Sequence, residues 1–215
     1  RDQPRSRGLG DVYKRQPVEV EGAINKGFPA FDMVGLPDAA VKESRDRVKS
    51  AMKNCGFNFP TAHITINLAP ADIKKEGPIY DLPILIAVLK MTGAVVAEIS
   101  DSAFLGELSL GGDVRPINGV LPMVIKAREL GYQKIYVPFA NGAEGAVVDG
   151  IEVYPVKNIL QLIAHLSGDK PIEPAVAKID EDNTDKQFVP DFSQVKGQAE
   201  VKLSLIHISE PTRPR

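Results

Sequence analysis

The sequence predicts an α/β fold in which helices cover a mixed sheet. Strand-like and helix-like segments alternate along the chain, and both tight hairpin turns and whole helices connect the strands. The size of the chain agrees with this, because 215 residues with 43% hydrophobic content can build one good-sized core without metals or disulfides.

In the first half of the chain, alternation of polar and apolar residues predicts strands at residues 18–21, 31–34 and 63–68. Asp38 is a candidate N-cap for a helix whose apolar residues recur at three- and four-residue spacing. That helix ends at Cys55, where Gly56 offers a stop. The nearly continuous apolar run 82–92 predicts a buried helix ended by Gly93.

In the second half, residues 104–110 and 114–117 are strand-like, and Gly111-Gly112 between them permits the positive φ angles of a tight hairpin. Asn118-Gly119 then turns the chain into a further helix. The remaining expected elements are a helix at 121–130, a strand at 134–137, a short helix at 143–148, a strand at 152–154 and a helix at 158–166.

Composition excludes several classes of protein and of site. The single cysteine, Cys55, permits no internal disulfide, and the chain has no apolar run that could span a membrane, so a cytoplasmic location is expected. A formal net charge of −2 argues against a nucleic-acid footprint over the whole surface. His63, His165 and His207 lack ligand spacing, and no GxxxxGKS/T loop occurs, so no metal or cofactor site is expected in this chain.

Five stretches carry a family resemblance: KEGPIYDLP at 75–83, LGELSLGGDVRPINGVLP at 105–122, FDMVGLPDAAVKESR at 31–45, ITINLAPAD at 64–72, and residues 191–198. Together they resemble the N-terminal domain of the ComM/YifB family of magnesium-chelatase-like AAA+ ATPases, from about residue 17 to residue 202. The resemblance implies the ribosomal protein S5 domain 2-like fold that the family shares with Lon proteases.

The same resemblance implies that peptidase chemistry is absent. Lon-type proteases use a Ser-Lys dyad, and the matching positions here hold Ile79 and Leu121, which can neither attack nor carry a proton. No catalytic residue is therefore expected. A degenerate Lon-like serine peptidase remains the alternative, although Ser44 and Ser109 are weak substitutes. Tyr80 and Asp81 could form a new site, but an Asp at a helix start is more often a cap.

As a member of this family, the chain would be a non-catalytic domain of a motor that processes DNA in branch migration, natural transformation and recombination. It would contribute to ring assembly or DNA engagement. The resemblance implies ATP and Mg for the missing AAA+ module. Its implied partners are that module, neighbouring subunits of a hexameric ring, and branched or single-stranded DNA, with no membrane. A stand-alone nucleic-acid-binding module is a further alternative.

The candidate binding residues are basic. The first helix carries four on one face, and three others would extend it if the fold brings them together: Lys42, Arg45, Lys49, Lys53, Lys74, Lys75 and Arg115. Such a stripe can follow a nucleic-acid backbone. However, Glu43 and Asp46 interleave with it, and no exposed aromatic residue is expected beside it for base stacking. A solvated helix face, with Asp46 paired to Lys42 or Lys49, and a subunit contact are the competing interpretations.

Both ends of the chain look foreign to the domain. Residues 11–16 can be encoded by DNA whose reverse complement encodes residues 203–208, as in a sequencing adapter read in frame. Residues 1–16 and 203–215 are therefore expected to be adapter-derived and are assigned no element, with a native basic N-terminal arm and a native tail as the alternative. Between them we expect a Lon-like domain at 17–168, an acidic linker at 169–190 and the start of a truncated AAA+ module at 191–202.

Overall fold

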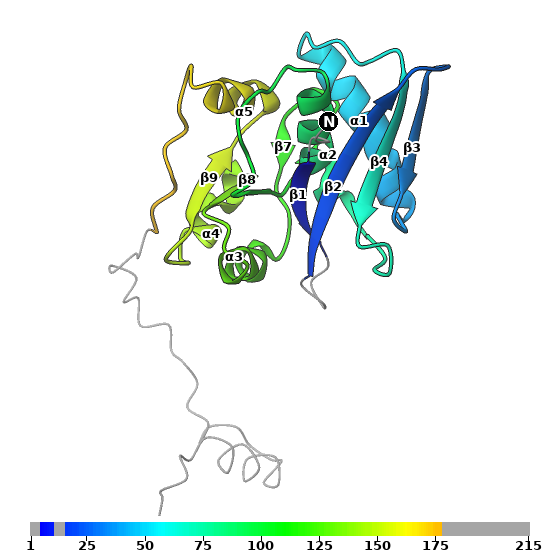
Figure 1. Ribbon diagram of the computed structural model, residues 1–215. Coiled ribbons are helices and arrows are strands. Elements are labelled where there is room, and N and C mark those ends of the chain that lie inside the picture. Colours follow the sequence, from blue (N-terminus) through cyan, green and yellow to red (C-terminus); the bar gives the residue numbers. More distant parts are fainter. Residues whose placement is uncertain (1–4, 11–15, 178–215) are drawn as a thin grey trace, which may run out of the picture. The chain divides into compact units, whose positions relative to one another are not determined.

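The structure, a computed structural model, describes residues 5–10 and 16–177, with side chains from Pro17 onward. Seven strands form one sheet in the order β3-β4-β2-β1-β5-β8-β9 (Figure 1). The strands are β1 (Arg5–Gly10), β2 (Gln16–Asn25), β3 (Ala30–Val34), β4 (His63–Ala69), β5 (Ser102–Phe104), β8 (Lys134–Pro138) and β9 (Glu152–Val156). A two-stranded sheet pairs β6 (Glu107–Leu108) with β7 (Val114–Arg115).

The main sheet mixes both pairing directions, which confirms the predicted α/β class. β2 is antiparallel to β1 and β4, whereas the β3-β4, β1-β5, β5-β8 and β8-β9 pairs are parallel. The helices are α1 (Ala39–Asn54), α2 (Asp81–Met91), α3 (Val120–Glu129), α4 (Gly142–Gly145) and α5 (Ile159–Leu166). Two 3-10 turns, η1 (Pro78–Tyr80) and η2 (Phe139–Asn141), precede α2 and α4.

Strand β1 departs from the sequence-based expectation, which assigned no element to residues 1–16. The structure places Arg5–Gly10 between β2 and β5, in the middle of the sheet. Ladder hydrogen bonds join backbone groups, so a segment without proline can pair regardless of its side chains. The adapter origin of these residues stays a prediction about the DNA.

Helix α1 forms where its capping signal predicts. The Asp38 carboxylate accepts the Val41 backbone N–H at 2.8 Å, so it satisfies one of the donors left open at the helix start. Val41, Ser44, Val48, Ala51 and Met52 are buried along one face, as the spacing of apolar residues indicates. Lys42, Arg45, Lys49 and Lys53 lie on the exposed side.

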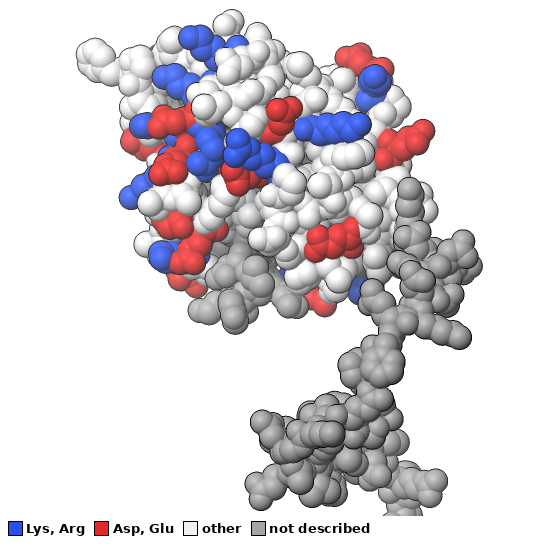
Figure 2. Space-filling view, turned by 180° about the vertical axis from the view of Figure 1, so that it is seen from behind, with Lys and Arg blue, Asp and Glu red and all other residues white. Residues whose placement is uncertain are grey.

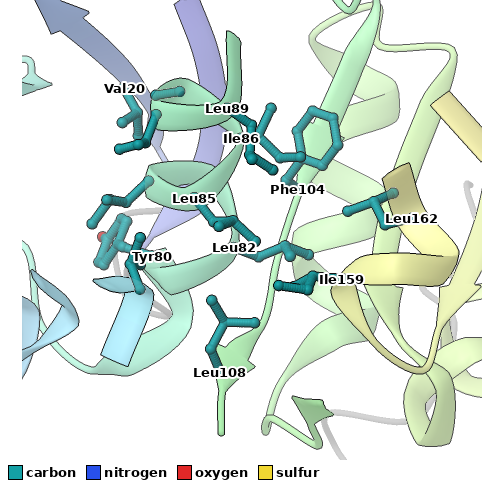
Figure 3. Close-up of a cluster of buried hydrophobic side chains, with 14 of the residues drawn as sticks. Val20, Tyr80, Leu82, Leu85, Ile86, Leu89, Phe104, Leu108, Ile159 and Leu162 are labelled. Atoms are coloured by element: carbon teal, nitrogen blue, oxygen red, sulfur yellow. The ribbon is translucent and has the colours of Figure 1, made fainter. Parts of the chain in front are cut away.

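The core consists of two clusters, one on each side of the sheet. Residues of β5, β8 and β9 alternate between them: Phe104, Tyr136 and Tyr154 belong to the larger cluster, and Ala103, Ile135 and Val153 to the smaller. Helices α1, α2 and α5 complete the larger cluster, and α3 completes the smaller. Figure 3 shows α2 in the larger cluster, with Val20 on one side of the helix and Phe104 on the other.

The predicted strand 104–110 is divided in the structure. Phe104 ends β5 in the main sheet, and β6 begins at Glu107 in the hairpin with β7. Gly106 lies between them, and a Cβ there would meet the Val114 side chain at 2.7 Å. The division thus needs glycine, which lets β7 approach closely where the chain leaves one sheet for the other.

The domain continues past the predicted start of the linker at residue 169. Ile172 is only 7% exposed and packs against the larger cluster, and the Ala175 N–H donates to the Val153 carbonyl at 2.7 Å. A polar, proline-containing segment of this kind lacks periodicity, so its docking was not predictable from pattern. The remainder of the linker, residues 191–202 and residues 203–215 lie outside the described residues.

Candidate functional site

The two positions of the expected peptidase dyad lie in apolar surroundings. Ile79 in η1 and Leu121 in the first turn of α3 are both half-buried and pack against the smaller core cluster. The Ile79 carbonyl accepts the Gly106 N–H at 3.2 Å. The Leu121 N–H donates to the Glu144 carboxylate at 3.0 Å, which caps the start of α3 with a negative charge. The structure therefore brings both positions to one apolar cluster.

Asp81 is not the helix cap that the sequence suggested. Its carboxylate is fully buried and accepts from Arg47 Nε at 2.6 Å, from Arg47 Nη2 at 3.0 Å and from the Leu108 N–H at 3.0 Å. Tyr80 beside it is also buried. This bidentate pair ties α1, α2 and β6 together, so the carboxylate is occupied by structural contacts. Sequence reasoning missed Arg47, although it lies three residues after Ser44 and four before Ala51, a spacing that places it beside the buried face of α1.

The candidate substitute nucleophiles have structural partners as well. Ser44 is fully buried, and its hydroxyl accepts from Arg47 Nη2 at 3.2 Å. Ser109 accepts the Asp113 N–H at 2.9 Å within the β6-β7 hairpin. Neither hydroxyl is hydrogen-bonded to a lysine or a histidine in the part of the chain that the structure describes.

Lys75 does not extend the basic surface as expected, because its side chain is fully buried. Its ammonium donates to the Pro70 carbonyl, and its backbone exchanges hydrogen bonds with Leu36 and Asp38 at 3.0 Å each. Burial lowers the pKa of Lys75 from its usual value, and the nearby Asp72 opposes this effect. Lys75 therefore connects the loop after β4 to the start of α1.

The other two outlying cations are exposed but paired elsewhere. Lys74 lies 2.7 Å from Glu76, and Arg115 on β7 lies 3.4 Å from Glu107. On α1 itself, Asp46 pairs with its neighbour Arg45 at 3.0 Å, not with the Lys42 or Lys49 expected from helical spacing. Figure 2 shows acidic and basic side chains interspersed on the face seen from behind. The seven basic candidates thus do not form one continuous patch.

Three of these cations do converge, in a concave site that we call the β3–α1 groove. It consists of two pockets, of about 370 Å³ and 230 Å³, which adjoin because both include Phe31 and Arg45. Its main residues are Phe31, Met33, Lys42, Arg45, Lys49 and Phe59. It lies along β3, which is an edge strand of the sheet.

No exposed aromatic residue was expected beside the basic face, but two partly buried rings that pack against the larger core cluster line the groove. Phe31 and Phe59 are half-buried, their ring centroids are 5.9 Å apart, and the Lys49 ammonium lies 6.0 Å from the Phe59 centroid. Phe59 comes from the connection between α1 and β4. Because β4 pairs in parallel with β3, this connection must return beside the start of β3, a signal that could have placed Phe59 near Phe31.

His165 lies in an aromatic cluster that the sequence did not reveal. Its Nε2 is 3.1 Å from the Tyr136 hydroxyl, and its Nδ1 accepts the Ile172 N–H at 2.8 Å. Burial lowers the pKa of His165, and the Lys134 charge lowers it further. Burial also raises the pKa of Tyr136, and burial together with Glu152 raises the pKa of Tyr154 to about 12. These groups stay neutral near pH 7. The hydrogen bond from Ile172 to His165 holds the segment after α5 against this cluster.

Comparison with known proteins identifies the family to which the chain belongs. Residues 20–141 match the family model described as subunit ChlI of Mg-chelatase. The chain is similar to competence protein ComM of Haemophilus influenzae, with 33% identity over 87% of this chain and 37% of the relative. It is 38% identical to YifB of Escherichia coli over 88% of this chain and 37% of the relative. Lon protease 2 of Bacillus subtilis is 27% identical over 71% of this chain and 29% of the relative.

The chain therefore spans a little over a third of the length of ComM and YifB. The similarity to a Lon protease accords with the mixed α/β architecture. Among the described residues, no helix has the length and apolar character needed to cross a bilayer.

Proposed function

Because the chain belongs to the family of subunit ChlI of Mg-chelatase, we propose that it is the non-catalytic N-terminal domain of a ComM/YifB-like AAA+ ATPase that acts in DNA processing. In the parent protein it contributes to ring assembly or to DNA engagement, in the cytoplasm. ATP and Mg belong to the AAA+ module that would follow. The name of ComM as a competence protein supports a role connected with DNA uptake.

The observation that carries the non-catalytic part is the packing of Ile79 and Leu121 against the smaller core cluster. A Ser-Lys dyad needs a hydroxyl and an amine that meet in a cleft, and these two side chains provide apolar contacts instead. The competing proposal is a degenerate serine peptidase. A fluorophosphonate probe distinguishes the two, since labelling of any Ser or Thr in the folded chain would support the peptidase.

DNA engagement is tested with the whole chain and a fluorescent four-way DNA junction in a salt series. We expect binding that weakens steeply with salt and is lost when Lys42, Arg45, Lys49 and Lys53 are all changed to Ala. A matched control changes Lys126, Arg128, Lys134 and Lys157 to Ala, which removes the same charge from other elements. Equal loss in both variants would show that net charge alone, not the α1 face, supports binding.

Ring assembly is tested separately, by adding the chain to the isolated AAA+ module of the parent protein with ATP and Mg. Sedimentation should show a ring that contains both components. A stand-alone nucleic-acid-binding module would bind DNA fully without that module and would not enter the ring. If the chain neither joins the ring nor binds the junction, the proposal is wrong.

A further inference from the structure

The β3–α1 groove combines two chemical features along its length. Phe31 and Phe59 provide apolar ring surface, with an angle of 35° between the two planes. Lys42, Arg45 and Lys49 come from successive turns of α1: Lys42 lines the smaller pocket, Lys49 the larger and Arg45 both. A ligand that fills the groove therefore meets aromatic surface and a row of cations together.

A nucleotide has the complementary combination, because it joins a flat π-face to a phosphate. Base stacking on aromatic side chains tolerates any base, and lysine or arginine can contact the phosphate at its side. The larger pocket, of about 370 Å³, is of the size range of small-ligand sites. The smaller pocket adjoins it along β3, so a ligand with a repeating backbone can continue from one pocket to the next.

The charge of the groove favours an unpaired strand over a duplex. Asp46 and Asp32 also line the two pockets, and they pair with Arg45 at 3.0 Å and with His63 at 2.6 Å. The two carboxylates reduce the net positive charge of the groove, although only Arg45 of its three cations is in one of these pairs, so phosphates alone would bind less tightly than at three unopposed cations. An exposed ion pair such as Arg45–Asp46 is worth little, so a phosphate can displace it. The remaining affinity must come from the rings, which only an unstacked base can reach.

We propose that the β3–α1 groove binds single-stranded nucleic acid, with bases against Phe31 and Phe59 and phosphates at Lys42, Arg45 and Lys49. This deepens the DNA engagement proposed above and rests on it. The proposal adds a preference for single-stranded over double-stranded nucleic acid. It also adds two stacking residues to a site that would otherwise be defined by its basic residues alone.

The test measures anisotropy of a fluorescein-labelled oligothymidylate with the whole chain at low salt. We expect the single strand to bind more tightly than the same oligonucleotide in duplex with oligoadenylate. Thymidine monophosphate should compete far less effectively than an unlabelled oligothymidylate. Equal binding of strand and duplex, or equal competition by the free nucleotide, would overturn the proposal.

Single substitutions then distinguish the contribution of the aromatic rings to binding from that of the charges. Phe59→Leu keeps an apolar side chain of similar bulk but removes the ring, and it should weaken strand binding about tenfold without changing the salt slope. Lys49→Ala should lower the slope of log K against log salt by about 0.7, the value for one phosphate on a single strand.

The chain offers a matched control at the other side of the molecule, where the Lys157 ammonium lies 4.3 Å from the Phe139 centroid. Phe139→Leu and Lys157→Ala remove the same chemistry outside the groove and should leave binding unchanged. Circular dichroism confirms that each variant is folded. If Phe59→Leu binds like the parent while the α1 cations still matter, DNA engagement stands and the stacking proposal fails. If no DNA binds at all, this proposal fails, while the ring-assembly role stays open to its own test.

Discussion

At the scale of single residues, the Arg47–Asp81 pair is the contact whose loss should cost most. Asp81 is fully buried and receives two of its three hydrogen bonds from Arg47. Arg47→Met should therefore leave a buried, largely uncompensated carboxylate and lower the free energy of unfolding by about 3–5 kcal/mol. Urea denaturation followed by circular dichroism measures this.

The control for that change is Arg45→Met, on the exposed side of the same helix, where the pair with Asp46 is solvated. It should change stability by less than about 1 kcal/mol. Adding Asp81→Leu to Arg47→Met should restore part of the loss, since the unpaired charge is then removed. Equal effects of the two arginine variants would show that the Asp81 contact contributes no more than a surface pair.

His165 should make stability depend on pH. Because burial lowers its pKa in the folded protein below the usual 6.5, the unfolded chain takes up the proton first as pH falls. The stabilisation is therefore complete above about pH 6.5 and is lost as pH falls through the lowered folded pKa. Protonation also places a hydrogen on Nδ1, where the Ile172 N–H now donates.

Melting temperatures recorded between about pH 5 and pH 8 test this, in a His63→Gln background that leaves His165 as the one histidine of the described residues. The parent should lose stability in the acidic half of that range more steeply than a His165→Asn variant, whose amide cannot titrate. A His165→Asn variant with the same pH slope would contradict the assignment.

At the scale of elements, the turn between β3 and α1 depends on Gly35. Its φ is 98°, and a methyl group there would overlap the Leu68 carbonyl oxygen. Gly56 after α1 has a φ of 82° but nothing within 4 Å of the added Cβ. Gly56→Ala should therefore cost only the backbone strain, about 1–2 kcal/mol, and Gly35→Ala clearly more. Thermal unfolding of the two variants gives the comparison, and a smaller loss for Gly35→Ala would refute it.

Elements with strong local signals were predictable from the sequence. The Asp38 cap, the apolar spacing up to Met52 and the continuous apolar run of α2 each depend on nearby residues, and the structure confirms them. The division of residues 104–110 into β5 and β6 was not predictable, because it follows from two different sheets that meet at Gly106. The place of Arg47 likewise depends on a carboxylate 34 residues away.

At the scale of the whole molecule, the segment after α5 should be part of the folding unit. A chain that ends at Lys178 keeps the Ile172 packing and the Ala175–Val153 hydrogen bond, whereas a chain that ends at Gly168 loses both. The shorter chain should be about 2–3 kcal/mol less stable, the value for exposing one large aliphatic side chain. Chemical denaturation of the two truncated chains measures the difference; equal stability would make residues 169–177 part of the linker after all.

The candidate site was only half accessible to sequence reasoning. Lys42, Arg45 and Lys49 follow from helical spacing, but their aromatic partners come from β3 and from the connection before β4, and only the fold brings them together. Lys75 shows the converse, because a lysine in a polar stretch gives no sign that it will be buried. Residue spacing shows which residues share a face of one helix or strand, whereas a groove is formed by residues of several elements.

The packing of Ile79 and Leu121 has a historical consequence. If an ancestor carried a Ser-Lys dyad at these positions, its replacement by side chains that now pack against the smaller core cluster is hard to reverse. Serine at Ile79 would give up apolar contacts, and lysine at Leu121 would bring an ammonium beside the same cluster, so either reversion alone weakens the fold without restoring a reaction. Selection acting on one substitution at a time would then disfavour each single step back toward a Ser-Lys dyad, because each step alone destabilises the folded domain.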